Sequence, residues 1–235
     1  NVRACRAYAE KRPKVAARRD LETLRAALRH WDKEHGRLNP MPSIALPVKP
    51  EARDRYLTRK EAASLLRAAR RVPHLARFIL LGLYTGTRSG ALLAAEWSWV
   101  DLEHGLMRRR APGEADGSTK RRPPVRLGFR IRAHLRRWKR QDETVAFAKD
   151  ADGVPIRRIC HYDGQPVTKL RRSWLTARNA AGLDKAVTPH TLRHTRATWL
   201  MQGAVDMWQA AQSLGMSVRM LETVYGHHHP DYQKD

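Results

Sequence analysis

The stretch Thr188-Pro189-His190-Thr191-Leu192-Arg193-His194 combines residue types that bind anions and transfer protons. Proline suits the first turn of a helix, so the spacing predicts a helix that begins at Thr188-Pro189. The free N–H groups and the dipole at such a helix start favour an anion. Arg193 follows His190 by three residues, which places both side chains on one face. This pair could hold a phosphate and move a proton, although His-x-x-Arg alone also fits a basic surface helix.

Two other residues strengthen the phosphate interpretation. Arg88 follows Tyr84-Thr85-Gly86-Thr87 at the end of an apolar segment. An arginine at the edge of a core needs an anion or a carboxylate as partner. Tyr225, between Val224 and Gly226, would by itself be a packing residue. Together with two arginines and a histidine, it becomes a candidate nucleophile toward phosphorus.

The charge of the chain points to a polyanionic partner. The 235 residues include 46 Lys/Arg and 23 Asp/Glu, a formal net charge of +23. Residues 108–140 hold 13 Lys/Arg and two acidic residues, and arginine pairs well with phosphate. A solvated cationic face is the alternative, and the prolines and glycines in this region argue against a basic membrane helix. Nucleic acid is therefore the expected partner.

Composition excludes several other classes of protein. Hydrophobic residues make up 42% of the chain, too many for a disordered one, and the apolar run at 78–84 is far shorter than a membrane span. Two cysteines exclude a disulfide framework and a four-cysteine zinc site, and they favour a reducing compartment. No secretory signal is visible, although Asn1 is not an initiator methionine. We expect a cytoplasmic protein, associated with the nucleoid when it is on DNA.

The elements around these residues fall into two predicted domains. Apolar spacing predicts a helix over 14–36, ended by Gly36, after the end of another helix at 4–10. Four prolines within 38–55 predict a stiff linker. The boundary is therefore placed after residue 50, with domains at 1–50 and 51–235. The first is too short to bury a core alone.

The second domain is predicted to be mainly helical, an α+β fold with one small antiparallel sheet. Thr58 and Glu61 form a capping box before an apolar helix, and a buried helix follows through residues 75–83. Residues 97–127 predict short strands with turns at 103–105 and 113–117. Further helices are expected at 131–138, at 170–177, from Thr188-Pro189 through residue 200, and at 204–213 and 217–224.

At this point the chain resembles a known family. Arg88 in Thr-Gly-Thr-Arg, His190-Thr191-Leu192-Arg193-His194, and Leu214-Gly215-Met216-Ser217 before Tyr225 resemble the signature of the tyrosine recombinases, or phage integrases. The resemblance covers about residues 55–230. It implies a catalytic DNA-breaking and rejoining domain over 51–235. Residues 1–50 would then be the C-terminal part of a helical core-binding domain plus the linker.

The resemblance also implies a role for each matching residue. Arg88 and Arg193 would bind the non-bridging oxygens of the scissile phosphate, and His190 would handle a proton and donate a hydrogen bond. Lys120 would protonate the leaving 5′ oxygen, with Arg121 and Arg122 as alternatives. Tyr225 would attack phosphorus and form a 3′-phosphotyrosyl bond. His194 and His227 would support the site, and the duplex would be held by Arg108, Arg109, Arg110, Arg121 and Arg122.

Two positions depart from the family pattern. Met216 stands where the family commonly has histidine or tryptophan, and methionine donates no strong hydrogen bond to phosphate. Ala91 stands where a carboxylate often orients the first arginine, a role that Glu96 could take. These departures keep open a non-catalytic relative that regulates or bridges DNA.

The leading prediction is a site-specific recombinase from a prophage or a genomic island. The resemblance implies double-stranded attachment sites as partner and a homotetramer on DNA. Only ten residues follow Tyr225, so we expect a monomer when the chain is free. No cofactor and no metal are expected. A metal-dependent nuclease would rest only on the run 227–229, whose adjacent histidines point in different directions.

Overall fold

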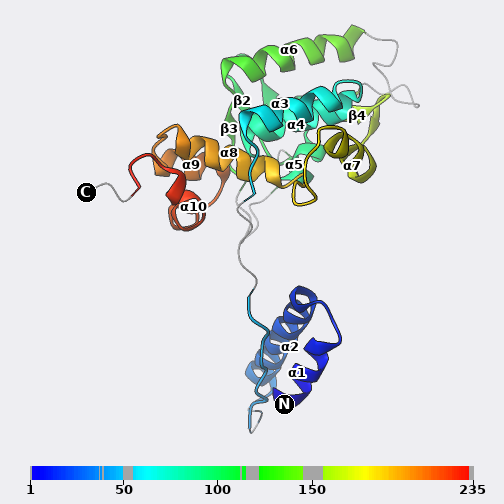
Figure 1. The fold of residues 1–235 in the computed structure, drawn as a ribbon. Coiled ribbons are helices and arrows are strands. Elements are labelled where there is room, and N and C mark those ends of the chain that lie inside the picture. Colours follow the sequence, from blue (N-terminus) through cyan, green and yellow to red (C-terminus); the bar gives the residue numbers. More distant parts are fainter. Residues whose placement is uncertain are drawn as a thin grey trace. The chain divides into compact units, whose positions relative to one another are not determined.

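The computed structural model describes residues 2–36, 38, 40–49, 55–111, 113, 114, 122–144 and 156–232. The chain divides into two compact units, residues 1–53 and 54–235 (Figure 1). The boundary between them lies within the proline-rich segment.

The first unit is a pair of helices, α1 (Val2–Glu10) and α2 (Lys14–His35). They pack through Cys5, Ala17 and Leu21, and the Tyr8 hydroxyl donates to Asp20 across 2.8 Å. Gly36 ends α2 with a φ of 100°, a backbone conformation that favours glycine. Both helices lie where the sequence predicted them.

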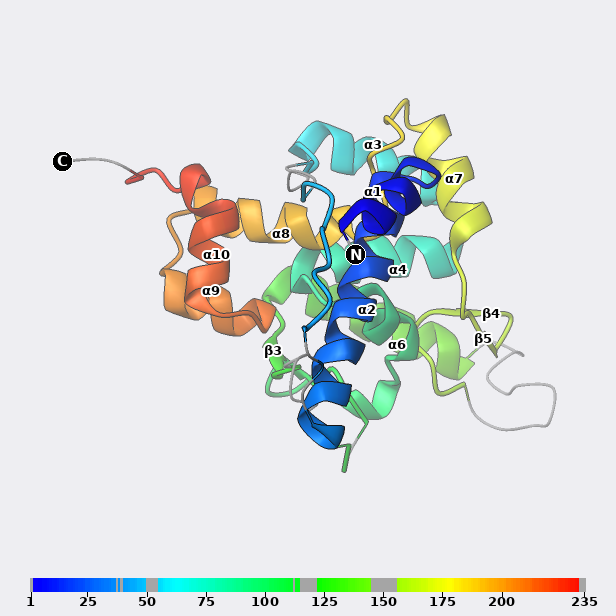
Figure 2. The same ribbon diagram turned by 90° about the horizontal axis from the view of Figure 1, so that it is seen from below.

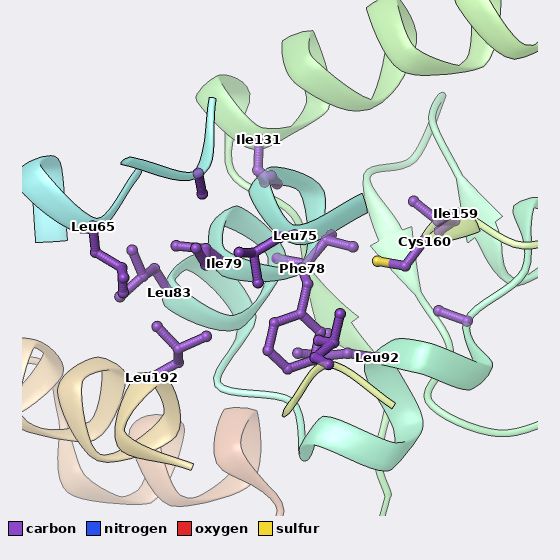
Figure 3. Close-up of a cluster of buried hydrophobic side chains, with 14 of the residues drawn as sticks. Leu65, Leu75, Phe78, Ile79, Leu83, Leu92, Ile131, Ile159, Cys160 and Leu192 are labelled. Atoms are coloured by element: carbon purple, nitrogen blue, oxygen red, sulfur yellow. The ribbon is translucent and has the colours of Figure 1, made fainter. Parts of the chain in front are cut away.

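The second unit is built around α4 (Pro73–Thr85), a helix buried on most of its surface. It is preceded by α3 (Arg59–Ala69), whose capping box joins Thr58 and Glu61 as predicted. Along α4 runs α8 (Thr191–Gln202), and Gly82 permits this approach because an added Cβ would lie 2.7 Å from Leu192 Cδ1. Figure 3 shows Phe78 of α4 and Leu192 of α8 within this core.

A short helix and a small sheet follow α4. They are α5 (Ser89–Ala94), the 3₁₀ turn η1 (Trp97–Trp99), β1 (Val100–Asp101), β2 (Leu106–Met107) and β3 (Val125–Arg126). The three strands are antiparallel in the order β1-β2-β3, with Met107 opposite Val100 and Val125. Next comes α6 (Phe129–Thr144), which buries Ile131, Leu135 and Trp138.

The rest of the unit comes before and after α8 in the chain. A hairpin of β4 (His161–Tyr162) and β5 (Gln165–Pro166) precedes α7 (Arg171–Ala180), which packs on α3. Beyond α8, the helices α9 (Met207–Leu214) and α10 (Val218–Tyr225) lie side by side in Figures 1 and 2. The 3₁₀ turn η2 (Gly226–His228) ends this group. These elements form a second core with the C-terminal half of α8.

A buried ion pair joins α4 to α6. Both terminal nitrogens of Arg77 donate to Asp142 across 2.7 Å, and Trp97 Nε1 donates to the same carboxylate at 3.1 Å. The ring of His161 lies 3.1 Å from it. Burial alone would raise the pKa of Asp142, but the hydrogen bonds from His161 and Arg77 outweigh it and lower that pKa.

The predicted mainly helical fold with a small antiparallel sheet is confirmed, but the predicted start of α8 is wrong. Thr188 begins a tight turn in which its N–H donates to Thr191 Oγ1 and its carbonyl accepts from Thr191 N–H, both at 2.9 Å. The helix therefore begins at Thr191, with His190 as its N-cap residue. In the described part of the chain, no helix has the length and apolarity to cross a membrane.

Candidate active site

The turn after α4 positions Arg88. Gly86 ends the helix with a φ of 61°, and an added Cβ there would collide with the side chain of Leu214. The buried hydroxyl of Thr85 donates to Leu81 O at 2.6 Å and accepts from Thr87 N–H at 3.2 Å. Arg88 then leaves the turn in an extended conformation as the N-cap residue of α5. A rigid turn thus fixes the backbone of the first predicted arginine.

The second predicted arginine is attached to the same turn. Arg193 is 6% exposed, and its guanidinium donates to Gly86 O at 2.8 Å. Burial and the nearby charge of Arg88 lower the pKa of Arg193 to about 10, while Tyr225 acts in the opposite direction. The tertiary structure therefore brings together Arg88, Arg193 and Tyr225, which are far apart in the sequence.

Tyr225 is the last residue of α10, and its side chain turns back toward α8. The residue is only 5% exposed, and its hydroxyl oxygen lies 2.6 Å from His194 Nδ1. The ring of His190 meets the ring of His194 edge-on, with centroids 4.9 Å apart. Desolvation, followed by the charges of Arg193 and Arg88, lowers the pKa of His190, which favours its neutral form. Two histidines and the predicted nucleophile thus form one continuous cluster.

Arg109 is not at the surface, where the sequence placed it as a DNA-binding residue. It is 3% exposed and donates to Thr85 O at 2.7 Å and to Ser213 O at 2.6 Å. It therefore connects the end of α4 to the end of α9. Burial, then the charges of Arg193, Arg88 and Arg196, lower the pKa of Arg109 to about 9. Its Nε is buried and has no hydrogen-bond partner among the described residues.

The electrostatics of this cluster favour an anion. The charges that act on Arg109 are all those of other arginines, and the same holds for the charge that lowers the pKa of Arg193. Several desolvated cations side by side are costly without a counter-charge. A phosphate group placed between Arg88 and Arg193 would supply that charge.

The other predicted DNA-binding residues have different outcomes. Lys120 and Arg121 lie outside the described residues. Arg108, Arg109, Arg110 and Arg122 line one hollow of about 340 Å³, where Arg122 pairs with Glu114 at 3.0 Å. Arg108 is exposed and Arg110 is half-buried. The basic segment therefore contributes both to the surface and to the interior.

The departures from the family pattern also have defined positions. Met216 packs against the second core, beside α8, α9 and α10. Glu96 forms an ion pair with Arg158 at 3.6 Å. His227 lies in η2, with its ring centroid 4.0 Å from that of His228, which in turn meets Tyr56 edge-on at 5.1 Å. These ring contacts hold the turn that directly follows Tyr225.

Metal ligation has no support in the described residues, where no group of three or more histidine, cysteine or acidic side chains is placed to hold an ion. Both cysteines are buried free thiols. Burial raises the pKa of Cys160 to about 12, so this thiol is not a candidate nucleophile.

Sequence reasoning missed two features that the spacing did contain. Arg109 follows the end of β2 by two residues, and both Arg109 and Met107 at that strand end are buried. His190 and His194 lie four residues apart, and their rings share the face that Tyr225 approaches. Neither pattern alone predicts the contact partner, which is Thr85 or Ser213 for Arg109 and Tyr225 for His194, because each partner lies on a distant element.

Comparison with known proteins gives a consistent result. The model described as "Phage integrase family" matches residues 55–231. Tyrosine recombinase XerC from Xanthomonas campestris pv. campestris is 29% identical over 206 residues, which cover 84% of this chain and 59% of the relative. The integrase of Salmonella phage P22 is 25% identical over 218 residues, 90% of this chain and 54% of that protein. The chain thus spans less than two thirds of these relatives.

Solved structures share the fold at lower sequence identity. A lambda integrase dimer bound to a COC' core site has a TM-score of 0.71 at 20% identity, over 98% of this chain and 65% of that one. The Tn1549 transposon integrase in complex with transposon right end DNA also has a TM-score of 0.71, at 17% identity, over 95% and 78% of the two chains.

Proposed function

The chain belongs to the phage integrase family, and from this premise we propose that it is a site-specific tyrosine recombinase that cleaves and rejoins duplex DNA. The observation that carries the proposal is the position of Tyr225. Its hydroxyl lies 2.6 Å from a histidine, at the end of a helix that packs on the helix carrying Arg193. This arrangement supports Tyr225 as nucleophile, a histidine as proton acceptor and Arg193 as phosphate ligand.

Arg88 and Arg193 would bind the two non-bridging oxygens of the scissile phosphate. Negative charge grows on these oxygens as phosphorus becomes five-coordinate, so fixed cations stabilise the transition state more than the ground state. The hydrogen bond from Arg193 to Gly86 O keeps its guanidinium in place before substrate arrives. His190 would donate a further hydrogen bond to the phosphate.

The chemistry needs a nucleophile and an acid. The oxygen of Tyr225 would form a bond to phosphorus while the bond to the 5′ oxygen breaks, which leaves a 3′-phosphotyrosyl link. Lys120 would protonate the departing 5′ oxygen. The phosphotyrosyl bond retains the energy of the phosphodiester, so a 5′ hydroxyl from another strand can reverse the reaction.

The proposed partner is a double-stranded attachment site from a prophage or a genomic island. Support comes from the net charge of +23 and from the exposed Arg108 beside Arg122 and Arg110. A lambda integrase tetramer bound to a Holliday junction shares the fold, with a TM-score of 0.67 at 20% identity. We propose a homotetramer on DNA, a monomer when free, and a contribution of residues 1–37 to duplex binding together with the basic region 108–140.

A non-catalytic DNA-binding relative is the second candidate. The observation in its favour is Met216, which packs against the second core at a position where the family commonly presents a hydrogen-bond donor to the phosphate. Such a protein would bind the same duplex and would leave it uncut.

Covalent attachment to DNA distinguishes the two candidates. A nicked duplex with the sequence of the junctions that flank the proposed prophage or genomic island would be incubated with the protein in EDTA. The products would then be run on a denaturing gel. We expect a slower band that is absent with Tyr225→Phe. Tight, salt-sensitive binding to that duplex without any adduct would support the non-catalytic candidate instead.

A further inference from the structure

We propose that His194 is the group that removes the phenol proton of Tyr225 as the phosphotyrosyl bond forms. This inference rests on the proposed function and assigns one step of it. The contact is direct, since the phenol oxygen lies 2.6 Å from Nδ1 of the imidazole. His194 therefore touches the reacting atom and is a catalytic residue in the strict sense.

The geometry separates the roles of the two histidines on α8. His190 responds to the charges of Arg193 and Arg88, so its ring belongs to the phosphate-binding side of the site. His194 lies one helical turn further along, with its ring between those of His190 and Tyr225, at centroid distances of 4.9 Å and 5.8 Å. His190 is thus suited to the phosphate, and His194 to the nucleophile.

The step balances without another reactant. The O–H bond of Tyr225 breaks and its proton moves to Nδ1 of His194, while the phenol oxygen forms its bond to phosphorus. The bond from phosphorus to the 5′ oxygen breaks, and that oxygen takes a proton from the general acid. In the rejoining step, His194 returns its proton to the departing phenolate. The assignment requires a neutral imidazole with the proton on Nε2.

Other ionisable groups surround this contact. The ring of His190 meets that of His194, and the charges of Arg88 and Tyr225 both act on Arg193. The elements packed together here, α8, α10 and η2, also carry Arg196, Arg219, Glu222, His227 and His228. Helix α9 contributes none, since its residues carry neither charges nor histidine. A titration seen in activity must therefore be assigned through variants and not from its midpoint alone.

The test compares His194→Asn with the wild-type chain in single-turnover cleavage of the nicked duplex. Asparagine keeps a polar atom near the position of Nδ1 but cannot take up the proton. We expect cleavage at pH 7 to slow by about 10²-fold or more, the usual effect of losing a general base. The variant should recover as the pH rises toward about 10, the ordinary pKa of a tyrosine side chain, because a larger share of phenolate needs no base. His104→Gln, an exposed histidine on the β1–β2 turn, should match the wild-type rate.

A sulfur substitution in the DNA tests whether His194 acts on the nucleophile or on the leaving group. A duplex with sulfur in place of the bridging 5′ oxygen has a leaving group that needs no acid, so His194→Asn should stay slow on it. Rescue by sulfur would place His194 at the leaving group and overturn the proposal. A wild-type rate for His194→Asn, or a slow rate that does not recover with pH, would overturn it as well.

Two outcomes separate this inference from the proposed function. Absence of any adduct with wild-type protein contradicts the function itself, whereas an adduct formed equally by His194→Asn contradicts only the role of His194. Folding of the variant is checked by its melting temperature and by duplex binding. Nitrogen NMR of the wild-type imidazole gives an answer that needs no variant: a protonated Nδ1 in the neutral ring would overturn the assignment.

Discussion

Two buried arginines in the second unit are stabilised in opposite ways. Arg77 is 7% exposed and forms a two-pronged pair with the buried Asp142. Arg109 is 3% exposed, donates to two backbone carbonyls, and is repelled by Arg193, Arg88 and Arg196. The counter-charge of Arg77 is part of the chain. The hydrogen bonds of Arg109 go to backbone carbonyls, and the charges that act on it are those of other arginines, so a substrate phosphate could supply a counter-charge there.

Arg77 thus carries a charge that supports the fold, whereas the arginines around Arg109 carry charges suited to binding an anion. A buried ion pair holds α4 to α6, and breaking it leaves a charge with no compensation. The arginine cluster instead keeps positive potential at one place, where an anion gains more than it would in water. The predictions below test this division, beginning with the largest expected effect.

Loss of Arg193 should have the largest effect on chemistry. In Arg193→Gln, the phosphate loses a fixed cation and the Gly86 carbonyl loses its charged donor, so single-turnover cleavage should fall by about 10²–10³-fold. Quenched cleavage assays measure this. Arg77→Gln at the structural pair should lower stability and leave the cleavage rate of the folded fraction near wild type. Equal losses of cleavage in both variants would contradict the division.

Loss of Asp142 should have the largest effect on stability. Asp142→Leu leaves Arg77 buried and uncompensated, which should lower the free energy of unfolding by about 3–5 kcal/mol in urea melts. The double change Arg77→Leu with Asp142→Leu removes both charges and should regain much of that loss. If the double variant is no more stable than the single one, the ion pair is not what holds α4 to α6.

An added anion should stabilise the arginine cluster. Inorganic phosphate should raise the free energy of unfolding of the wild-type chain by about 2.7 kcal/mol at a hundredfold excess over its Kd, and the melting temperature should rise accordingly. The increase should be smaller in Arg193→Gln, which lacks one of the two proposed phosphate ligands. Matched increases in both proteins would show that phosphate acts elsewhere on this basic chain.

The smallest expected effect is a pH dependence from His190. The pKa of His190 is lowered in the folded chain, so below about pH 6.5 the unfolded chain binds the proton more readily than the folded one. The free energy of unfolding therefore decreases as the pH is lowered through this range. His190→Gln should remove that part of the slope in urea melts between pH 8 and pH 5. A bound phosphate would favour the protonated ring, so DNA binding should take up protons in the same range. A slope that is unchanged in the variant would assign the effect to another group.

Local patterns in the sequence were sufficient for most of the fold. The capping box at Thr58, the glycine after α2, and the apolar spacing of α6 each predict an element from a few neighbouring residues. The predicted start of α8 was too early because residues 188–191 form a tight turn, in which Thr191 N–H donates to Thr188 O, before the α-helix begins at Thr191. Propensity alone does not decide between the two.

The candidate site likewise has a part that the sequence indicates and a part that only the tertiary structure decides. Residue types and spacing singled out Arg88, His190, Arg193 and Tyr225 as candidates only when taken together, because Tyr225 alone fits packing and His-x-x-Arg alone fits a surface helix. Only the tertiary structure brought His194 to the phenol of Tyr225, 31 residues away, and Arg193 to Gly86, 107 residues away. It also turned Arg109 inward onto the ends of α4 and α9. Contacts of this kind depend on how helices pack, and packing is set by the whole core at once.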